Sequence, residues 1–551
     1  MVGEQASWLV TSSRIREIPA WSLLATALAG LSLFLIRFSF GSTPLALPLD
    51  DAYIHSAFAS HLAHGQVWGL FAGQHSSGES SPLWPWLLAP AELGRLHGAV
   101  PWALILDALA FLPLPFLCAS LAGTRARSLW LGLGFAFCGP LLSLALSGME
   151  SLPALSLGLA ALYRYGRGDL RGAGLFAAGA VCLRPDALLL LGSLGLVSLW
   201  SNGAERGSSA RRGHLLKSLA PGALLAAGAL LLLFALQGFH APTTLEGRRW
   251  LMGLPAELSW NTLGASPLRL FREWLHAFGA DFGLGRVVFA HPGSLLGVLH
   301  ALWKIVFPFT LLAGVFAWGR RWKKERSSAV MVLVVWTLSS LLFYALLLPT
   351  RGHLGRYQPQ LYPLLFFFAV EGIAFLGRLP RLGGFSATAA GALLILALLS
   401  STVEQSGLWC AAVRHLERVH LRAASSLSTI LPRDARLAVF DVGAVAYEDP
   451  AAMIDLSGLS DPEMAHALSA ASSGAVVRLL HQRGASHLLL PMLRDGAADG
   501  LDRRLGLRSS GELRLEEMRR WESPLAAWGP AFAYTGNAFR QLVLYRIDWL
   551  K

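Results

Sequence analysis

Charged residues are scarce in this sequence. Asp, Glu, Lys and Arg together make up 15% of its 551 residues, whereas a typical soluble domain carries about 25%. Hydrophobic residues make up 54%. A chain of this composition cannot cover its surface with polar groups in water, so lipid must solvate much of it. The composition therefore excludes an ordinary soluble protein and indicates a polytopic membrane protein.

Cysteine is also scarce. The four cysteines, Cys118, Cys138, Cys182 and Cys410, form no close pair, so neither a disulfide framework nor a zinc site is indicated. The formal net charge of +12 comes with no zinc-finger spacing and no alternation of basic and aromatic residues, so no nucleic-acid partner is predicted. In a membrane protein such an excess of positive charge is typical of cytoplasmic loops.

Long apolar runs are abundant. About 20 apolar residues are needed to cross the hydrocarbon core of a bilayer. On this criterion we predict roughly eleven transmembrane helices, at about 20–40, 100–122, 128–147, 150–164, 172–184, 186–200, 218–238, 297–318, 329–348, 357–377 and 385–401.

The basic residues give these spans an orientation. With the N-terminus in the cytoplasm, every short Arg- and Lys-rich loop falls on the cytoplasmic side, as the positive-inside rule requires. The apolar stretch 83–97 must then be a re-entrant or surface-lying helix, because a further span would put the later loops out of phase. The outer face receives two long loops, 41–99 and 239–296, and everything after the last span.

The chain changes character after the last span. We predict a transmembrane catalytic domain over 1–403 and an extracytoplasmic α/β domain over 404–551. Within the latter, 436–441, 487–490 and 541–547 have the short apolar pattern of strands.

Two adjacent acids follow the first span. Asp50 and Asp51 stand where the chain leaves the membrane on the outer face. Paired carboxylates at such a place suit general-base catalysis or the binding of a divalent cation. The alternative is a capping role for the helix that begins near Ala52, because Asp is a favourable N-cap.

Histidines cluster in the first outer loop but do not predict a metal site. His55, His61, His64 and His75 lack the i, i+4 spacing of a helical metal motif, and only His61 and His64 could share a helix face. Metal dependence is left open at this stage.

A series of short motifs resembles the GT-C class of membrane glycosyltransferases, most closely the branch of mycobacterial terminal arabinofuranosyltransferases. The resembling segments are Asp50-Asp51-Ala52-Tyr53-Ile54, Ser77-Gly78, Ser81-Pro82-Leu83-Trp84, Gly148-Met149-Glu150, Arg184-Pro185-Asp186, Pro242-Thr243-Thr244 with Arg248, Arg356-Tyr357, and Asp441-Val442-Gly443-Ala444. Some positions depart from the branch: Glu79 stands two residues after the usual position of a Glu, Arg248 replaces a Lys, and Asp186 replaces a Glu.

The resemblance implies an inverting transferase in the bacterial cytoplasmic membrane. Its donor would be a polyprenyl-phosphate-linked sugar and its acceptor an extracytoplasmic glycan or lipid, such as a cell-envelope glycan. The resemblance assigns the catalytic base to Asp50, with Asp51 orienting the acceptor or a cation. The Asp441 segment is expected to determine the fold of the C-terminal module.

The charges of the other motif residues suit such a reaction. Arg356, Tyr357 and Arg248 are predicted to bind the donor phosphate, because a guanidinium fits phosphate oxygens in two-pronged geometry. Glu79, Glu150, Arg184 and Asp186 are predicted to orient the acceptor. The structural alternatives are an interfacial arginine at 356, a simple loop charge at 248, and helix-to-helix contacts for Glu150 and Asp186.

Two other classes of function remain as alternatives. A transporter or flippase of a lipid-linked substrate would place charges deep inside spans and show paired repeats. Here the candidate charges lie at span ends, and no repeat is evident. A catalytically inactive scaffold would keep the fold without needing Asp50.

Overall fold

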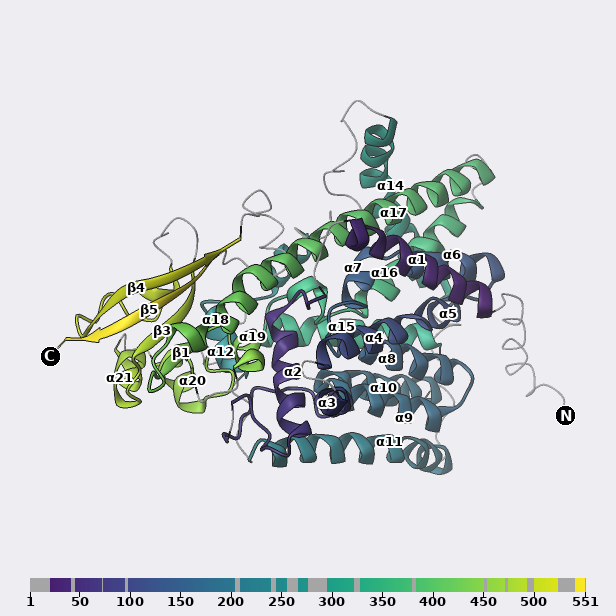
Figure 1. Ribbon diagram of the computed structural model, residues 1–551. Helices are drawn as coiled ribbons and strands as arrows, with labels where there is room; N and C mark the ends of the chain where they lie inside the picture. Colours follow the sequence, from purple (N-terminus) through teal and green to yellow (C-terminus); the bar gives the residue numbers. More distant parts are fainter. Residues whose placement is uncertain are drawn as a thin grey trace.

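A bundle of helices and a smaller sheet-containing domain make up the protein. The computed structural model describes residues 20–40, 45–71, 73–94, 98–203, 209–238, 244–254, 266–275, 295–321, 328–378, 383–449, 453–470, 474–492, 500–523 and 541–550. The first described helix, α1 (Ala20–Phe40), lies in the part of the bundle away from the sheet, and the last strand, β5 (Gln541–Trp549), lies at the other end of the molecule (Figure 1).

Most of the bundle comes from helices that follow the predicted spans. They are α1 (Ala20–Phe40), α4 (Ala99–Phe111), α5 (Leu114–Ala119), α6 (Arg125–Ala136), α7 (Gly139–Leu144), α8 (Ser151–Gly166), α9 (Leu170–Leu183), the short helix η2 (Pro185–Ala187), α10 (Leu188–Gly203), α11 (Ser209–Leu236), α14 (Leu295–Arg321), α15 (Ala329–Leu347), α16 (Leu361–Leu376) and α17 (Gly383–Leu416).

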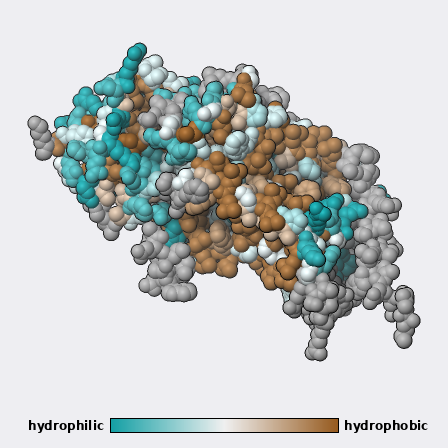
Figure 2. Space-filling model, turned by 90° about the horizontal axis from the view of Figure 1, so that it is seen from below, coloured by the Kyte–Doolittle hydropathy of each residue, from teal (hydrophilic) through white to brown (hydrophobic). Residues whose placement is uncertain are grey.

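Four stretches of described helix are long and apolar enough to cross a membrane: Ala99–Ala119, Gly213–Leu236, Ala329–Leu347 and Thr388–Ile430. Shorter apolar helices accompany them, and on the face seen in Figure 2 a broad apolar surface extends from the hydrophilic end of the molecule to a smaller hydrophilic patch. An exposed apolar surface of this kind suits a lipid environment. The predicted count of eleven spans is not confirmed.

Several short helices complete the bundle, and the first three of them contact the C-terminal domain. They are α2 (Asp50–Ala63), α3 (Trp84–Gly94), α12 (Thr244–Leu251) and the 3₁₀ turn η3 (His353–Gly355). The stretch predicted as re-entrant, 83–97, forms α3, which contains Pro90 and has only 11 residues. Such a helix is too short to cross a bilayer.

Two glycines allow α14 and α16 to touch backbone to backbone. A Cβ added to Gly372 would lie 1.8 Å from the carbonyl oxygen of Thr310, and one added to Gly314 would lie 1.8 Å from that of Phe368. In lipid there is no hydrophobic driving force between helices, so they associate largely through van der Waals packing. Small residues at a crossing strengthen this packing because they let the two backbones approach closely. The contact therefore depends on the absence of both Cβ atoms.

We expect Gly372→Ala to destabilise the protein by roughly 1–3 kcal/mol, because the new methyl group must push two backbones apart. Gly319→Ala, at a position in α14 with open space around it, is the matched control and should be neutral or slightly stabilising. Thermal unfolding in detergent measures both. Equal unfolding temperatures for the two variants would contradict the close packing.

A five-stranded sheet forms the core of the C-terminal domain. The strand order is β2-β1-β3-β5-β4. Its strands are β1 (Leu437–Val439), β2 (Ile454–Asp455), β3 (His487–Met492), β4 (Leu513–Glu522) and β5 (Gln541–Trp549). The first three are parallel, and β5 pairs antiparallel with β3 and β4. The accompanying helices are α18 (Arg422–Ile430), α19 (Gly443–Glu448), α20 (Pro462–Ser469), α21 (Ala475–Gln482) and α22 (Leu501–Arg504).

The last long helix joins the two parts. Helix α17 continues through position 403, the predicted domain boundary, into the π-helical turn η4 (Glu417–Leu421) and then α18. In Figure 1 this helix runs from the far side of the bundle to the sheet. The boundary at 403 stays a prediction, and it falls inside a continuous helix.

Candidate active site

A cavity of about 570 Å³ lies where the bundle meets the C-terminal domain. One part of its lining is apolar: Leu183, Leu188, Leu189, Leu233, Phe343, Leu347 and Leu348. Another part is charged and includes eight of the nine residues singled out from the sequence: Asp51, Glu79, Glu150, Arg184, Asp186, Arg248, Arg356 and Tyr357. Residues that are hundreds of positions apart in the chain thus face one space.

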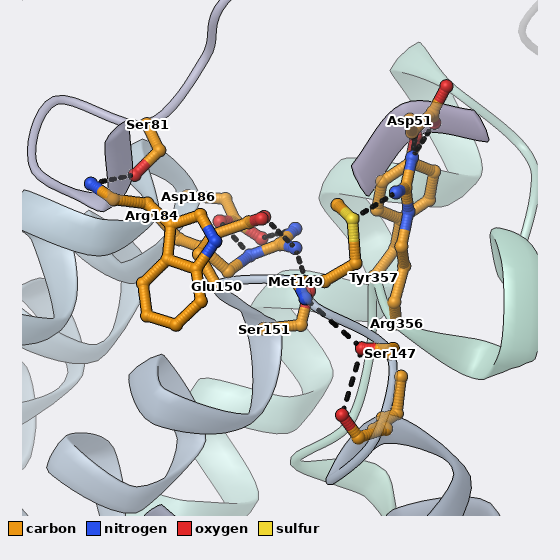
Figure 3. Close-up of polar contacts among 12 residues, drawn as sticks. Asp51, Ser81, Ser147, Met149, Glu150, Ser151, Arg184, Asp186, Arg356 and Tyr357 are labelled. Atoms are coloured by element: carbon orange, nitrogen blue, oxygen red, sulfur yellow. Dashed lines mark hydrogen bonds and ion pairs between the residues drawn. The ribbon is translucent and has the colours of Figure 1, made fainter. Parts of the chain in front are cut away.

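Asp51 holds two arginines at the cavity. Its Oδ2 accepts a hydrogen bond from Nη2 of Arg248 at 2.8 Å and another from Nη2 of Arg356. Burial alone would raise the pKa of Asp51, but the two guanidinium charges hold it well below its usual value. The carboxylate therefore stays ionised, and Figure 3 shows it beside the side chain of Arg356.

Three arginine side chains lie around the ring of Tyr357. The guanidinium carbons of Arg356, Arg248 and Arg184 lie 5.1, 5.6 and 5.6 Å from its ring centroid. Its other neighbour is Tyr344, whose ring is stacked at 5.1 Å with an interplanar angle of 11°. Cation–π attraction of this kind gains strength where water is excluded. The aromatic pair thus helps to keep three positive charges close together.

The loop before Arg356 has an unusual backbone. Leu354 has a φ of 59°, and Gly352 and Gly355 also have positive φ values. Leu354 is buried, and a bulky residue in this region is costly unless its surroundings hold it there. The tight loop sets the direction from which Arg356 enters the cavity.

His55 lies between two buried carboxylates. Its Nδ1 is 2.6 Å from Oε2 of Glu79, and its Nε2 is 2.9 Å from Oε2 of Glu150. Burial alone would lower the pKa of His55, but the two carboxylates raise it to about 10. His55 is therefore an imidazolium at neutral pH.

Arg184 extends this network of charged side chains. Its Nη1 donates to Glu150 at 3.1 Å, while Nε and Nη2 donate to the two oxygens of Asp186 at 3.0 and 3.1 Å. Tyr344 donates its hydroxyl to Asp186 at 2.8 Å. Figure 3 shows Glu150, Arg184 and Asp186 as one group beside the pair of Asp51 and Arg356. Alternating charges keep each member hydrogen-bonded despite burial.

Hydrogen bonds join the motif that ends at Trp84 to the motif that begins at Gly148. The indole nitrogen of Trp84 donates to the carbonyl of Gly148 at 3.1 Å. Oδ2 of Asp107, from α4, accepts the amide hydrogens of Gly148 and Met149 at 2.8 and 3.2 Å. Gly148 has a φ of 76°, a conformation that favours glycine. These contacts fix the start of α8 and with it Glu150.

Asp50 takes a different position from Asp51. Its two carboxylate oxygens accept the amide hydrogens of Gly443 and Ala444 at 2.9 and 2.8 Å, so it contacts the C-terminal domain and is not among the residues that line the cavity. Burial raises the pKa of Asp50 to about 6. The two adjacent acids therefore face different partners: one bonds to the sheet domain and the other to the arginines.

Tyr344 and Asp107 belong to this site but were not singled out from the sequence, and His55 was considered there only as a metal ligand. Asp107 had a recognisable signal, because it is a lone carboxylate in the apolar run Ala99–Phe111, and such residues are functional candidates by default. The charge of His55 and the role of Tyr344 could not be inferred, since they arise from partners distant in the chain.

The charge of His55 predicts a pH-dependent stability. Because the folded pKa, about 10, is raised above the ordinary 6.5, the stabilisation is complete below about pH 6.5 and is lost as the pH rises through about 10. We expect the unfolding temperature to fall over this range. The variant His55→Gln, which cannot titrate, should be less stable at pH 7 and should lose less stability on going to pH 10. Parallel pH profiles for the two proteins would contradict the assignment.

The sequence left open whether the protein binds a metal ion. No group of three or more His, Cys, Asp or Glu side chains suited to hold an ion occurs among the residues that the structure describes. In the candidate site, the carboxylates of Glu79 and Glu150 form ion pairs with His55.

Sequence comparisons bear mainly on the C-terminal domain. A family model described as a domain of unknown function (DUF8728) matches residues 411–537, which begins within α17 and covers most of the sheet domain. Among curated proteins, no relative matches this sequence.

Two solved structures are similar over most of the chain. ArnT from Cupriavidus metallidurans, bound to undecaprenyl phosphate, matches with a TM-score of 0.53 at 12% identity, covering 96% of this chain and 98% of ArnT. The apo oligosaccharyltransferase of Archaeoglobus fulgidus matches with a TM-score of 0.51 at 14% identity, covering 87% and 70%.

At such low identity the likeness concerns the fold alone. The chain has the GT-C-like membrane fold that its motifs predict, with a C-terminal sheet. The narrower resemblance to the arabinofuranosyltransferase branch is not shown by these neighbours.

Proposed function

We propose that the protein is a glycosyltransferase that moves a sugar from a polyprenyl-phosphate donor to an extracytoplasmic acceptor. The observation that carries the proposal is the pair Arg248 and Arg356, held by Asp51 in a cavity whose remaining wall is leucine-rich. A lipid phosphate has the matching chemistry: an anionic group for the arginines and an isoprenoid chain for the apolar wall. ArnT, which has the same fold, is seen with undecaprenyl phosphate.

In the proposed reaction, one bond to the anomeric carbon forms as another breaks, and one proton is transferred. The donor phosphate would take over the guanidinium groups of Arg248 and Arg356 and so release the Asp51 carboxylate. An acceptor hydroxyl then loses its proton to Asp51 as its oxygen bonds to the anomeric carbon. The bond from that carbon to the phosphate oxygen breaks, and the polyprenyl phosphate leaves with its new charge stabilised by the arginines. Attack from the side opposite the phosphate inverts the anomeric centre.

The role of base moves from Asp50 to Asp51 in this proposal. Asp51 faces the cavity, whereas the carboxylate of Asp50 is occupied by two backbone amides. We propose Asp50 as an anchor that fixes the start of α2. Glu79, Glu150, Arg184 and Asp186 would orient the acceptor, with the imidazolium of His55 between the two glutamates. The motifs extend the proposal to a donor of the terminal arabinofuranosyltransferase type and a cell-envelope glycan acceptor.

Lipid binding and lipid release test the proposal. Purified protein should bind undecaprenyl phosphate more tightly than undecaprenol, because only the former offers charge to the arginines. It should also release free undecaprenyl phosphate from the lipid-linked sugars extracted from the native membrane when envelope glycan is added. Equal affinity for the alcohol and the phosphate would contradict the proposed donor site.

The proposed orientation places the N-terminus in the bacterial cytoplasm and the C-terminal domain outside the cytoplasmic membrane. Topology reporters fused after Ser208 and after Lys551 should then report opposite sides, since the first lies in a basic loop and the second follows the last span. Identical signals from both fusions would contradict this orientation.

A further inference from the structure

A second cavity, of about 580 Å³, lies between the first outer loop and the C-terminal domain. Its polar lining includes Gln74, His75 and Ser76 from the loop and Arg436, Asp461 and Arg483 from the domain. None of these residues belongs to the proposed donor site.

A thin wall separates the two cavities. Ser77, Gly78 and Leu459 line the donor cavity, whereas their immediate neighbours Ser76 and Ser460 line the second one. The two strips of wall touch, because a Cβ added to Gly78 would lie 3.1 Å from the Cβ of Ser460. A molecule in the second cavity would therefore lie within about one residue's thickness of the donor cavity.

Asp455 makes the wall rigid. Its Oδ1 accepts hydrogen bonds from the amide and hydroxyl of Ser457 at 2.8 and 2.5 Å, and its Oδ2 accepts those of Ser460 at 2.6 and 2.8 Å. The turn between the two serines, which carries Leu459, is thus closed around one buried carboxylate. A fixed wall allows the second cavity to position a ligand relative to the donor cavity.

The lining suits a neutral molecule rich in hydroxyl groups. The charges of Arg436 and Arg483 are balanced by those of Asp455 and Asp461, so the lining does not concentrate positive charge as a phosphate or nucleic-acid site would. Arg483 is already paired with Asp461 and Glu463. The exposed side chains of Gln74 and His75 can both donate and accept hydrogen bonds, which is what sugar hydroxyls require.

We propose that this second cavity binds a saccharide unit of the acceptor, and that the acceptor's terminal unit extends around the edge of the wall to bring its hydroxyl into the donor cavity. The inference rests on the proposed transferase function and adds the place where the acceptor binds. It gives the first outer loop two tasks: residues 74–76 hold the acceptor, and residues 77–80 face the donor.

Direct binding of oligosaccharides tests this proposal without turnover. The probe is a fluorescently labelled oligosaccharide fraction, released by mild acid from the envelope polysaccharides of the native host. We expect the double variant Gln74→Ala and His75→Ala to bind it about tenfold more weakly or worse, because several hydrogen bonds are lost. Gln66→Ala, an exposed change in the same loop, should bind like the wild type. Affinity for undecaprenyl phosphate should be unchanged in both variants.

Two results would overturn the assignment. One is unchanged oligosaccharide affinity in the double variant. The other is a wild-type protein that binds undecaprenyl phosphate but not the oligosaccharides. A wild type that binds oligosaccharides at this cavity but no lipid phosphate would contradict the proposed donor site and leave the saccharide site supported, so the two failures are distinguishable.

Discussion

Asp51→Asn should reduce sugar transfer by about a hundredfold or more, as expected for the loss of a general base. An amide has the size of the carboxylate but cannot take the acceptor's proton. Because it also competes less well for Arg248 and Arg356, the variant should bind undecaprenyl phosphate as tightly as the wild type or more tightly. Single-turnover transfer and equilibrium lipid binding measure the two effects.

Asp50→Asn is the matched control for this prediction. It places the same change one residue earlier, where the carboxylate accepts the amides of Gly443 and Ala444. We expect it to lower stability, since an amide group cannot accept both bonds as well, while transfer per folded molecule falls much less. If Asp50→Asn abolished transfer in a folded protein and Asp51→Asn did not, the role of base would return to Asp50, as the motif resemblance alone predicts.

Arg356→Ala should weaken the binding of undecaprenyl phosphate by about ten- to a hundredfold, the range that corresponds to loss of hydrogen bonds to a charged group. Arg356 is buried and directed at the cavity, so little solvent screening reduces its effect. Arg356→Lys should recover only part of the affinity, because an ammonium lacks the two-pronged geometry of the guanidinium. Titration of the lipid into detergent-solubilised protein measures the dissociation constants.

The control for Arg356 removes a positive charge elsewhere. Arg503 is exposed on α22 of the C-terminal domain, and Arg503→Ala should leave lipid affinity unchanged. Similar losses in both alanine variants would indicate a general effect of net charge instead of a clamp on the phosphate. Wild-type affinity in both Arg356 variants would exclude the role.

Local pattern predicted some strands of the C-terminal domain and missed others for a physical reason. The apolar segments 436–441, 487–490 and 541–547 coincide with β1, β3 and β5, which are mostly buried. Strand β4 was not predicted, because Leu513–Glu522 is mostly exposed and charged. It is held by pairing with β5, an interaction that a single segment does not reveal.

Motifs predicted the members of the candidate site better than their arrangement. Arg248 and Arg356 were singled out by charge and setting, and both lie against Asp51. The different positions of Asp50 and Asp51 could not be predicted, because they depend on how α2 begins and on the amides of Gly443 and Ala444, nearly 400 residues later. The same holds for His55, whose charge comes from Glu79 and Glu150.

The wall carried by Ser457 and Ser460 has a consequence for the biosynthesis of the protein. Leu459 completes the lining of the donor cavity, and a Cβ on Gly247, next to Arg248, would lie 2.5 Å from the carbonyl oxygen of Ser457. Ribosomes synthesise these residues after every predicted span, so a nascent chain already inserted in the membrane still lacks Leu459 of the proposed lipid-phosphate site. If the proposed function is right, turnover of the donor lipid would begin only once the C-terminal domain has been synthesised and has docked onto the bundle.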